Sequence, residues 1–464
     1  MSMTKVVSTL ALCLSFFLTA HAQQDLAGFR TGNYTGVNGV FFNPASIANN
    51  HYRWDVNIAG VSANVSNNQA KFRLNDLGDS FSGDKLGEQF FGKNAGYTNG
   101  LVNVAIHLPS FMFSVGPKMA FAVTARTRVL GNIKDIDGQL VDQITSDAAS
   151  FSDLPYTISS GSNTRINISG WSEIGASFAR EVYAKGPHYF KAGATLKYLM
   201  GTGNANVYLD QFNATVNADL VLQDAYINNA NANLGLNFSG ADITHFDTDQ
   251  LTKFSGHGIG VDLGGVYEWR PESGKQYKLK VGIALLDLGK INFKRDAQRS
   301  ADYEMSVSNA QRFYLSELNG VALNDYRAKL NEFPQYFKAG DTTSTAKYSV
   351  SLPATLQMDV DYHVYNKFYI NAASQIGLNS EKVRSYNGHF YSVFAVTPRY
   401  EGRRYGFFLP LSYNSLTKLN AGFSLHAGPV YLGSGSVLSA LVGDSRQADV
   451  FIGFRVSNLS RSKK

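Results

Sequence analysis

The 464-residue sequence has a single cysteine, Cys13, and it lies in the apolar segment at the N-terminus. The stretch Leu10-Ala11-Leu12-Cys13 has the outline of a lipid-attachment motif. However, Leu12 is bulkier than the small residue that such a motif needs before the cysteine, and apolar sequence continues beyond it. We therefore expect no lipid anchor. Disulfide bonds and thiolate chemistry are not expected in the rest of the chain.

Long apolar runs are also missing, since no stretch of about 18 apolar residues follows the N-terminal segment. That segment has Lys5, then an apolar run over residues 6–18, then the small-x-small motif Ala20-His21-Ala22. A positive charge, a short apolar run and such a motif predict a signal peptide, cleaved after residue 22. The sequence therefore predicts export without an anchoring helix.

Charged residues are scarce at 17%, whereas hydrophobic residues reach 44%, aromatic residues 13%, and glycines number 43. Mean hydropathy is nevertheless slightly negative, at -0.16. This composition favours a sheet-rich protein with one face toward lipid. The net charge of +6 is spread along the chain. We expect no nucleic-acid partner, because a basic cluster is missing.

Apolar and polar residues alternate with a period of two in segment after segment, which predicts β-strands. One example is the segment 352–363, with Leu356, Met358 and Val360 on one face and Gln357 and Asp359 on the other. Similar alternation covers 259–270, 276–285 and 450–457. Alternation alone also fits a soluble β-sandwich, so the connections between the strands have to decide.

Very short turns alternate with long polar stretches along the chain. The turns lie near 116–118, 185–187, 271–275, 365–367, 401–403 and 428–429, and the long stretches are 131–164, 201–256 and 290–350. Outer-membrane barrels have short periplasmic turns and long outer loops, and a sandwich has no reason to keep this order. The predicted fold is therefore all-β, a transmembrane antiparallel β-barrel with long extracellular loops.

Counting along this order gives about fourteen strands, an even number as such barrels require. They are placed near 53–65, 100–115, 119–130, 166–184, 188–200, 257–270, 276–289, 351–364, 368–379, 391–400, 404–413, 419–427, 430–436 and 448–457. Three regions follow: a signal peptide at 1–22, an N-terminal periplasmic or hatch segment at 23–52, and the barrel at 53–464. Aromatic residues near strand ends are expected at the two membrane interfaces; these are Tyr267, Trp269, Tyr362, Tyr405 and Tyr413.

The alternation also points many charged side chains into the lumen, where they have to pair with one another or meet water. These are Arg126, Arg128, Lys191, Lys197, Asp262, Glu268, Arg270, Lys278, Lys280, Asp359, Asp361, His363, Arg404 and Arg455. Asp359, Asp361 and His363 could alternatively do acid–base work. No serine with a supporting histidine and acid stands out. We favour a salt-bridged lumen and expect no enzyme activity and no catalytic residues.

Three stretches come close to motifs that hold bound groups. The stretch 87–94 resembles a phosphate-binding loop, but it ends in Asn94 where a hydroxyl residue is needed. Glycines 256–265 superficially match a dinucleotide motif, but they lie in a strand, where close backbone packing explains them better. Asp135, Asp137 and Asp142 form an incomplete set of calcium ligands. We therefore expect no cofactor and no metal.

The segment before the barrel contains Gly32, Gly36 and Gly39, followed by Asn43-Pro44-Ala45. Asn43 suits an N-cap and Pro44 suits the first helical position, so a short helix is predicted here. It either seals the barrel end or forms a plug inside the lumen. The glycine-rich approach to Asn43-Pro44-Ala45 resembles the hatch of the long-chain fatty-acid transporter (FadL-type) barrels.

The same motif occurs in barrels of type IX secretion systems and in uncharacterised outer-membrane families. The segments 108–113 and 285–289 resemble the latter. Resemblance to the transporters implies fourteen strands and a conduit for small hydrophobic molecules across the outer membrane. The alternative is a barrel that does not transport and serves secretion or surface interaction through its outer loops. The expected partners are outer-membrane lipid and either a small hydrophobic substrate or secretion-system or surface proteins.

Overall fold

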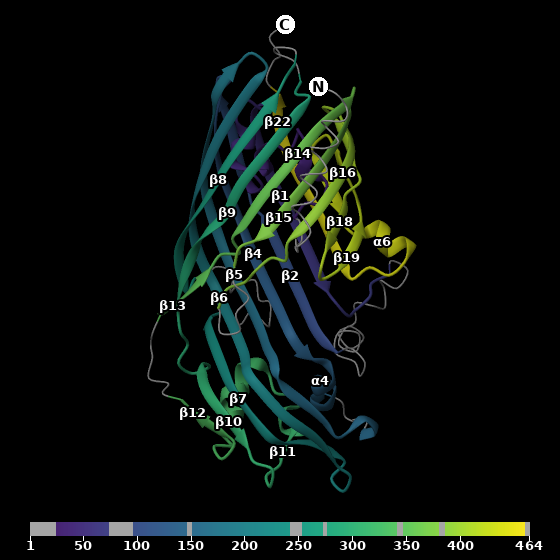
Figure 1. The fold of residues 1–464 in the computed structure, drawn as a ribbon. Coiled ribbons are helices and arrows are strands. Elements are labelled where there is room, and N and C mark those ends of the chain that lie inside the picture. The colour runs from purple at the N-terminus through teal and green to yellow at the C-terminus, as the bar shows by residue number, and fades with distance from the viewer. Residues whose placement is uncertain are drawn as a thin grey trace.

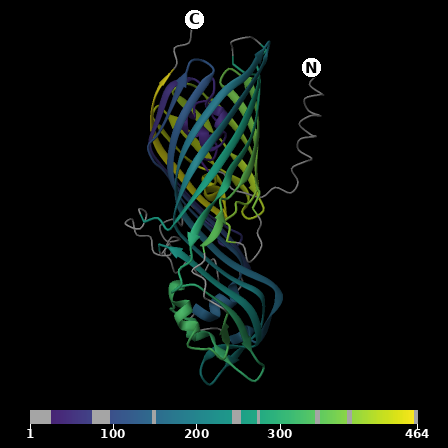
Figure 2. The same ribbon diagram turned by 90° about the vertical axis from the view of Figure 1, so that its left-hand side faces the viewer.

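The computed structural model describes residues 25–73, 96–145, 151–241, 253–271, 276–340, 347–379 and 386–459. The predicted signal peptide lies outside these ranges. Strands make up most of the structure, and they pair into a single tall sheet that closes on itself (Figure 1, Figure 2). The barrel occupies one end of the molecule, and several strands continue far beyond it.

Fourteen antiparallel strands form the barrel in chain order, and β22 closes it by pairing with β1. The predicted fold class and strand count are therefore confirmed. Some strands of the barrel are split in two. In order they are β1 (Tyr52–Asn67), β2 (Tyr97–His107) with β3 (Ser110–Val115), β4 (Met119–Asp137), β5 (Tyr156–Lys185), β6 (His188–Asp219), β8 (Gly256–Trp269), β9 (Leu279–Lys294), β13 (Lys347–Ser351) with β14 (Thr355–Tyr365), β15 (Phe368–Gly377), β16 (Val393–Glu401), β17 (Tyr405–Phe408) with β18 (Leu411–Asn414), β19 (Lys418–Ala421) with β20 (Phe423–Ala427), β21 (Val430–Ser434) and β22 (Gln447–Leu459).

Proline explains three of the four splits. Pro109, Pro353 and Pro410 each lie in the gap between two halves of one strand. Proline has no backbone N–H and cannot donate to the ladder, so regular pairing stops there and resumes beyond it. The fourth split, between β19 and β20, is at Gly422.

The outward face of the barrel is apolar. Large side chains such as Leu196, Ile259 and Val450 are 60%, 63% and 60% exposed. Trp269, Tyr362, Tyr405 and Tyr413 are exposed near strand ends, where interfacial aromatic residues are expected. A soluble protein does not expose a continuous band of this kind. The chain is thus a β-barrel of the outer-membrane type.

Beyond the barrel, the same sheet continues along β5 and β6, and we call this part the external sheet (Figure 1). Its other strands are β7 (Asp224–Gly240), β10 (Ala301–Val307), β11 (Phe313–Tyr314) and β12 (Phe337–Ala339), and β7 pairs with β6, β10 and β11. The end of the molecule with the external sheet also contains five short helices: α4 (Gly138–Thr145), η5 (Phe151–Asp153), η7 (Leu315–Leu318), η8 (Leu323–Asp325) and α5 (Tyr326–Leu330). The helix α6 (Val437–Val442) lies between β21 and β22. No helix among the residues described could span a membrane.

One expectation about the long loops was wrong. The stretch 201–256 was expected to be a polar loop, but β6 continues to Asp219 and pairs with β7. The residues of β7 alternate, and Ala232, Leu236 and Phe238 are buried on one face, so the strand signal was present in the sequence. Residues 314–337 contain the short helix α5 and the two 3-10 turns η7 and η8.

Matched arginine substitutions test whether the apolar band faces lipid. Leu196 lies midway along the part of β6 that pairs with β8, whereas Val221 lies in the hairpin at the far end of the external sheet. Both are exposed, at 60% and 90%. Leu196→Arg should destabilise the protein in bilayers by about 2–4 kcal/mol, and Val221→Arg by under about 1 kcal/mol. Urea unfolding in liposomes measures both, and equal costs would contradict a lipid-facing band.

Candidate functional site

The N-terminal segment, residues 25–51, lies inside the barrel, and we call it the plug. It contains three short 3-10 helices, η1 (Phe29–Thr31), η2 (Gly36–Phe41) and η3 (Pro44–Ile47). Asn43 caps η3, because its Oδ1 accepts a hydrogen bond of 3.0 Å from the Ala45 N–H, and Pro44 is the first helical residue. The predicted short helix is therefore present, as a 3-10 helix, and the segment lies within the lumen.

A glycine patch on the wall receives η3. It consists of Gly193 on β6, Gly264 on β8 and Gly282 on β9, and Gly193 and Gly264 are directly paired. A Cβ at Gly193 would lie 2.6 Å from the backbone of Pro44 and Ala45, and one at Gly264 would lie 2.1 Å from Asn43 Oδ1. Both positions must lack a side chain for the plug to lie this close to the wall.

Wall groups also bind the plug directly. Asn43 Nδ2 donates to the carbonyls of Gly265 and Ile283, at 3.1 and 3.2 Å. Asp55 on β1 accepts a hydrogen bond of 2.7 Å from the Val37 N–H. Glu401 on β16 accepts one of 2.8 Å from the Asn33 N–H. The plug backbone is thus held by polar groups from opposite parts of the wall.

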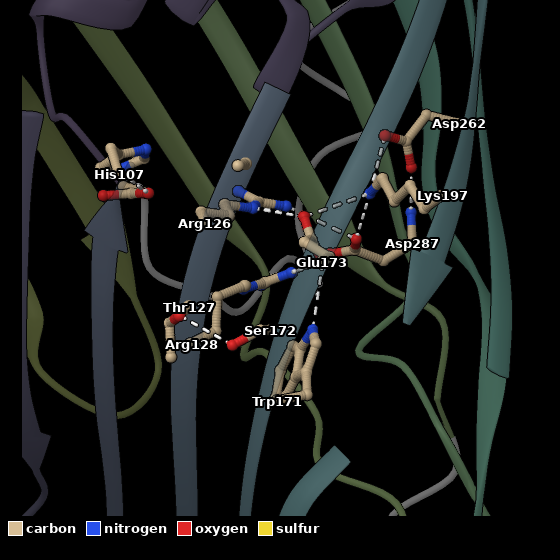
Figure 3. A network of polar contacts seen from close by, with 12 residues as sticks. His107, Arg126, Thr127, Arg128, Trp171, Ser172, Glu173, Lys197, Asp262 and Asp287 are labelled. Carbon is tan, nitrogen blue, oxygen red and sulfur yellow. Dashed lines mark hydrogen bonds and ion pairs between the residues drawn. The ribbon is translucent and has the colours of Figure 1, made fainter. Parts of the chain in front are cut away.

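Beyond the plug lies a cluster of six buried charged residues, the central ion cluster (Figure 3). Three cations and three carboxylates meet there, each 6% exposed or less: Arg126, Arg128, Lys197, Glu173, Asp262 and Asp287. Lys197 Nζ lies 2.7 Å from Asp262 and 2.6 Å from Asp287, and Arg128 lies 2.8 Å from Asp287. Arg126 pairs with Glu173. The charges balance, as burial away from water requires.

Asp287 joins this cluster because of a bulge in β9. The alternation of 279–285 would turn Asp287 toward lipid, together with Ile283. Its backbone has a φ of +59°, and the β8–β9 register shifts between Val261 and Leu263. A bulge redirects the following side chains, so Asp287 points inward. Sequence alternation missed this residue, and the only available signal was an acid among leucines at 285–289.

The lumen is closed again on the side of the long loops. An apolar layer there contains Leu130, Trp171, Leu199 and Phe293, with Phe390 packed against it. Residues 386–392 lie within this layer, where the His389 N–H and carbonyl both bond to Asn132, at 2.9 and 3.0 Å. Plug, central ion cluster and apolar layer therefore follow one another along the barrel axis.

A cavity of about 390 Å³ remains between the plug and the wall, on the side of the short turns. Its lining is mostly polar and includes Arg30, Lys191, Glu268, Arg270 and Lys280. A much smaller cavity of about 40 Å³ lies between the plug and the central ion cluster. Both cavities share Arg30, whose guanidinium donates to the side-chain oxygens of Gln357 and Gln375 at 2.7 and 3.3 Å.

The predicted lumenal charges fall into separate groups. Arg126, Arg128, Lys197 and Asp262 belong to the central ion cluster. Glu268 pairs with Lys191 and with Arg270. Lys280 lies 3.3 Å from Asp361, which also pairs with Arg399 at 2.7 Å. Arg455 lies 3.4 Å from Asp55. Sequence reasoning missed Asp55, Glu173, Arg399 and Glu401, although each is a charged residue in an alternating strand.

Four of the predicted lumenal residues belong to none of these ion-pair groups. Lys278 is not among the lumenal charges: its ammonium lies 4.6 Å from the ring of Tyr362, which faces outward. The reason is that β9 begins only at Leu279, so the alternation does not extend to Lys278. Arg404 is exposed in the turn before β17. His363 Nε2 lies 2.7 Å from the Asn366 carbonyl at another turn, and Asp359 lies beside Gly282.

Bound groups gain no support from side-chain clustering. Within the described ranges, no group of three or more His, Cys, Asp or Glu side chains could hold a metal ion. The stretch 87–94 lies outside these ranges. Gly256, Gly258, Gly260 and Gly264 lie in β8, as expected.

The central ion cluster predicts a large cost for removing one carboxylate. Asp287→Asn leaves three cations facing two carboxylates, so we expect a loss of about 3–5 kcal/mol in unfolding free energy. The control is Asp302→Asn, which removes the ion pair between Asp302 and Arg295; the Asp302 side chain is 46% exposed. This substitution should lower the unfolding free energy by under about 1 kcal/mol. Urea unfolding of both variants tests this, and similar losses would mean that the cluster is not desolvated.

The glycine patch predicts a difference between two adjacent glycines. Gly264→Val places methyl groups where Asn43 and Pro44 lie, whereas Gly265→Val faces outward, with nothing nearer than 3.7 Å to its Cβ. Overpacking at Gly264 should weaken plug binding by about 1–3 kcal/mol. Trypsin cleavage after Arg30 is a direct readout, and it should accelerate only in Gly264→Val. Equal cleavage of both variants would show that the plug does not depend on this contact.

A family model described as a family of unknown function (DUF5723) matches residues 44–435, which agrees with the expected uncharacterised family. No curated protein matches the sequence. The link to type IX secretion barrels stays a prediction, as does the absence of enzyme activity.

Solved structures with similarity to this chain include a hydrocarbon channel and a toluene transporter. A mutant of the TodX monoaromatic hydrocarbon channel is 8% identical with a TM-score of 0.44, covering 95% of this chain and 97% of that chain. A FadL homologue from Pseudomonas aeruginosa is 12% identical with a TM-score of 0.38, covering 94% and 98%. The toluene transporter TodX from Pseudomonas putida is 10% identical with a TM-score of 0.28, covering 94% and 99%. No substrate of this chain follows from similarity at this level.

Proposed function

We propose that this chain, which belongs to a family of unknown function (DUF5723), is a cell-surface interaction protein of the outer membrane. In this proposal the plugged barrel anchors the external sheet, which binds a partner protein. The observation that carries the proposal is the construction of the external sheet from the barrel's own strands. β5 and β6 are 30 and 32 residues long and pair with each other both in the barrel and in the external sheet, with register shifts along the way, so the two parts form one continuous structure.

The external sheet has a hydrophobic core of its own. Side chains from β6, β7, β10 and β11 pack together there, among them Phe212, Val216, Leu236, Tyr303 and Phe313. Phe313 makes edge contacts with Phe333, Tyr336 and Phe337 at 5.2–5.8 Å between ring centroids. A loop that only covers a pore does not need such a core. A folded unit carried far from the membrane is suited to presenting a defined surface.

The outermost hairpin of this sheet exposes three apolar side chains in a row. Leu220, Val221 and Leu222 are 69%, 90% and 62% exposed. Asp219 holds the turn, since its carboxylate accepts hydrogen bonds from the N–H groups of Val221 and Leu222 at 3.1 and 3.2 Å. These hydrogen bonds, above all the one from the Leu222 N–H, lower the pKa of the Asp219 carboxyl group. A braced turn that presents apolar side chains loses little conformational entropy when it binds.

Co-purification tests this proposal. The tagged protein is extracted from outer membranes in mild detergent, and we expect a stoichiometric partner protein to remain bound. The variant Leu220→Ser, Val221→Ser, Leu222→Ser should lose that partner while the barrel stays folded. The control is Leu441→Ser with Val442→Ser, which removes side chains 53% and 92% exposed on α6, away from the external sheet. Loss of the partner in the control alone, or no partner in the unmodified protein, would refute the proposal.

A conduit for small hydrophobic molecules past the plug is the second candidate. It is favoured by the cavity of about 390 Å³ that the plug leaves beside the wall. The polar lining of that cavity and the charged layer behind it speak against an apolar cargo, because an apolar solute gains nothing by entering a charged site. Liposome uptake of toluene separates the candidates. A conduit requires uptake in the unmodified protein that rises in Gly264→Val and stays unchanged in Gly265→Val, whereas a surface protein shows negligible uptake.

A further inference from the structure

The cavity between plug and wall has the features of a small binding site. It is enclosed on one side by plug residues from Arg30 to Thr35 and on the other by β6, β8, β9, β14 and β15. Exposed Gln276, in the turn before β9, also lines it, so the cavity reaches the barrel end that has the short turns. A solute could therefore enter without moving the central ion cluster.

Cations outnumber carboxylates around this cavity. Its lining contains four cationic side chains, Arg30, Lys191, Arg270 and Lys280, and two carboxylates, Glu268 and Asp359. Glu268 is shared between Lys191 and Arg270. Asp361 behind Lys280 is shared as well, since Arg399 bonds both of its oxygens at 2.7 and 2.8 Å. The excess of positive charge therefore favours an anion.

Hydrogen-bond donors are also available there. Asn33 Nδ2 and Ser46 Oγ, both on lining residues, are buried without a hydrogen-bond partner within the part of the chain that the structure describes. Asn33 Oδ1 already accepts from Lys280 Nζ at 3.0 Å and from the Tyr277 hydroxyl at 2.7 Å, which holds the amide with its Nδ2 free to donate. Buried donors of this kind require an acceptor.

We propose that this cavity binds a small solute through an anionic oxygen group, either a carboxylate or a phosphate. Lys280 supplies the charge and Asn33 Nδ2 supplies a hydrogen bond. Charge-assisted hydrogen bonds of this type are stronger and more selective than apolar contacts of the same size. The proposal goes beyond the surface function and does not depend on what the external sheet binds.

Two neighbouring lysines provide a matched test. Lys280→Met removes the charge inside the cavity, whereas Lys278→Met removes one that lies against outward-facing Tyr362. Calorimetric titration of the full-length barrel in detergent, at constant ionic strength, uses inorganic phosphate in one series and acetate in the other. We expect saturable one-site binding that weakens at least about tenfold in Lys280→Met and stays unchanged in Lys278→Met.

A second variant, Asn33→Asp, tests the proposal independently in case Lys280→Met does not fold. Asn33→Asp keeps the acceptor for Lys280 and Tyr277 but replaces the free donor with a negative charge, so anion binding should be lost in a folded barrel. Saturable binding of phosphate alone, acetate alone or both supports the proposal and identifies the group recognised. No saturable binding of either anion, equal affinities in the two lysine variants, or competition by toluene would overturn it.

Discussion

The structure depends on one electrostatic constraint: charged side chains that strand alternation turns into a protein-filled lumen must be paired there. These side chains are buried, so an unpaired ion would be costly. The six residues of the central ion cluster satisfy this constraint with equal numbers of each sign, and Asp287 is brought in by a bulge for that purpose. Further pairs, such as Asp55 with Arg455, satisfy it beside the plug.

The plug follows from the same constraint. Wall carboxylates pair with a wall arginine on one side and accept plug N–H groups on the other, as Glu401 does with Arg399 and Asn33. Gly193 and Gly264 have no side chain, and η3 can therefore lie directly against the wall. The same inward-facing groups thus neutralise the charge of the wall and bind the plug. Two candidate functional regions remain in the described chain, the polar cavity and the folded external sheet.

The regular parts of this fold could be predicted from sequence, because period-two alternation and turn length are local signals. All fourteen barrel strands were placed this way, and Asn43 with Pro44 marked η3. Irregular backbone defeated the same method: a bulge turns Asp287 inward, and a late strand start leaves Lys278 outside the lumen. The external sheet was missed for another reason. Its strands alternate, but faces rich in asparagine are equally typical of polar loops, and pairing between β6 and β7 is not a local property.

In the proposed function the barrel is closed, and the protein works through its surface. Conductance of the purified protein in planar bilayers tests this most directly, because plug, central ion cluster and apolar layer lie in series along the axis. A closed barrel should give no stepwise current above that of the bare bilayer at moderate voltage. Steady single-channel openings in the unmodified protein would contradict it.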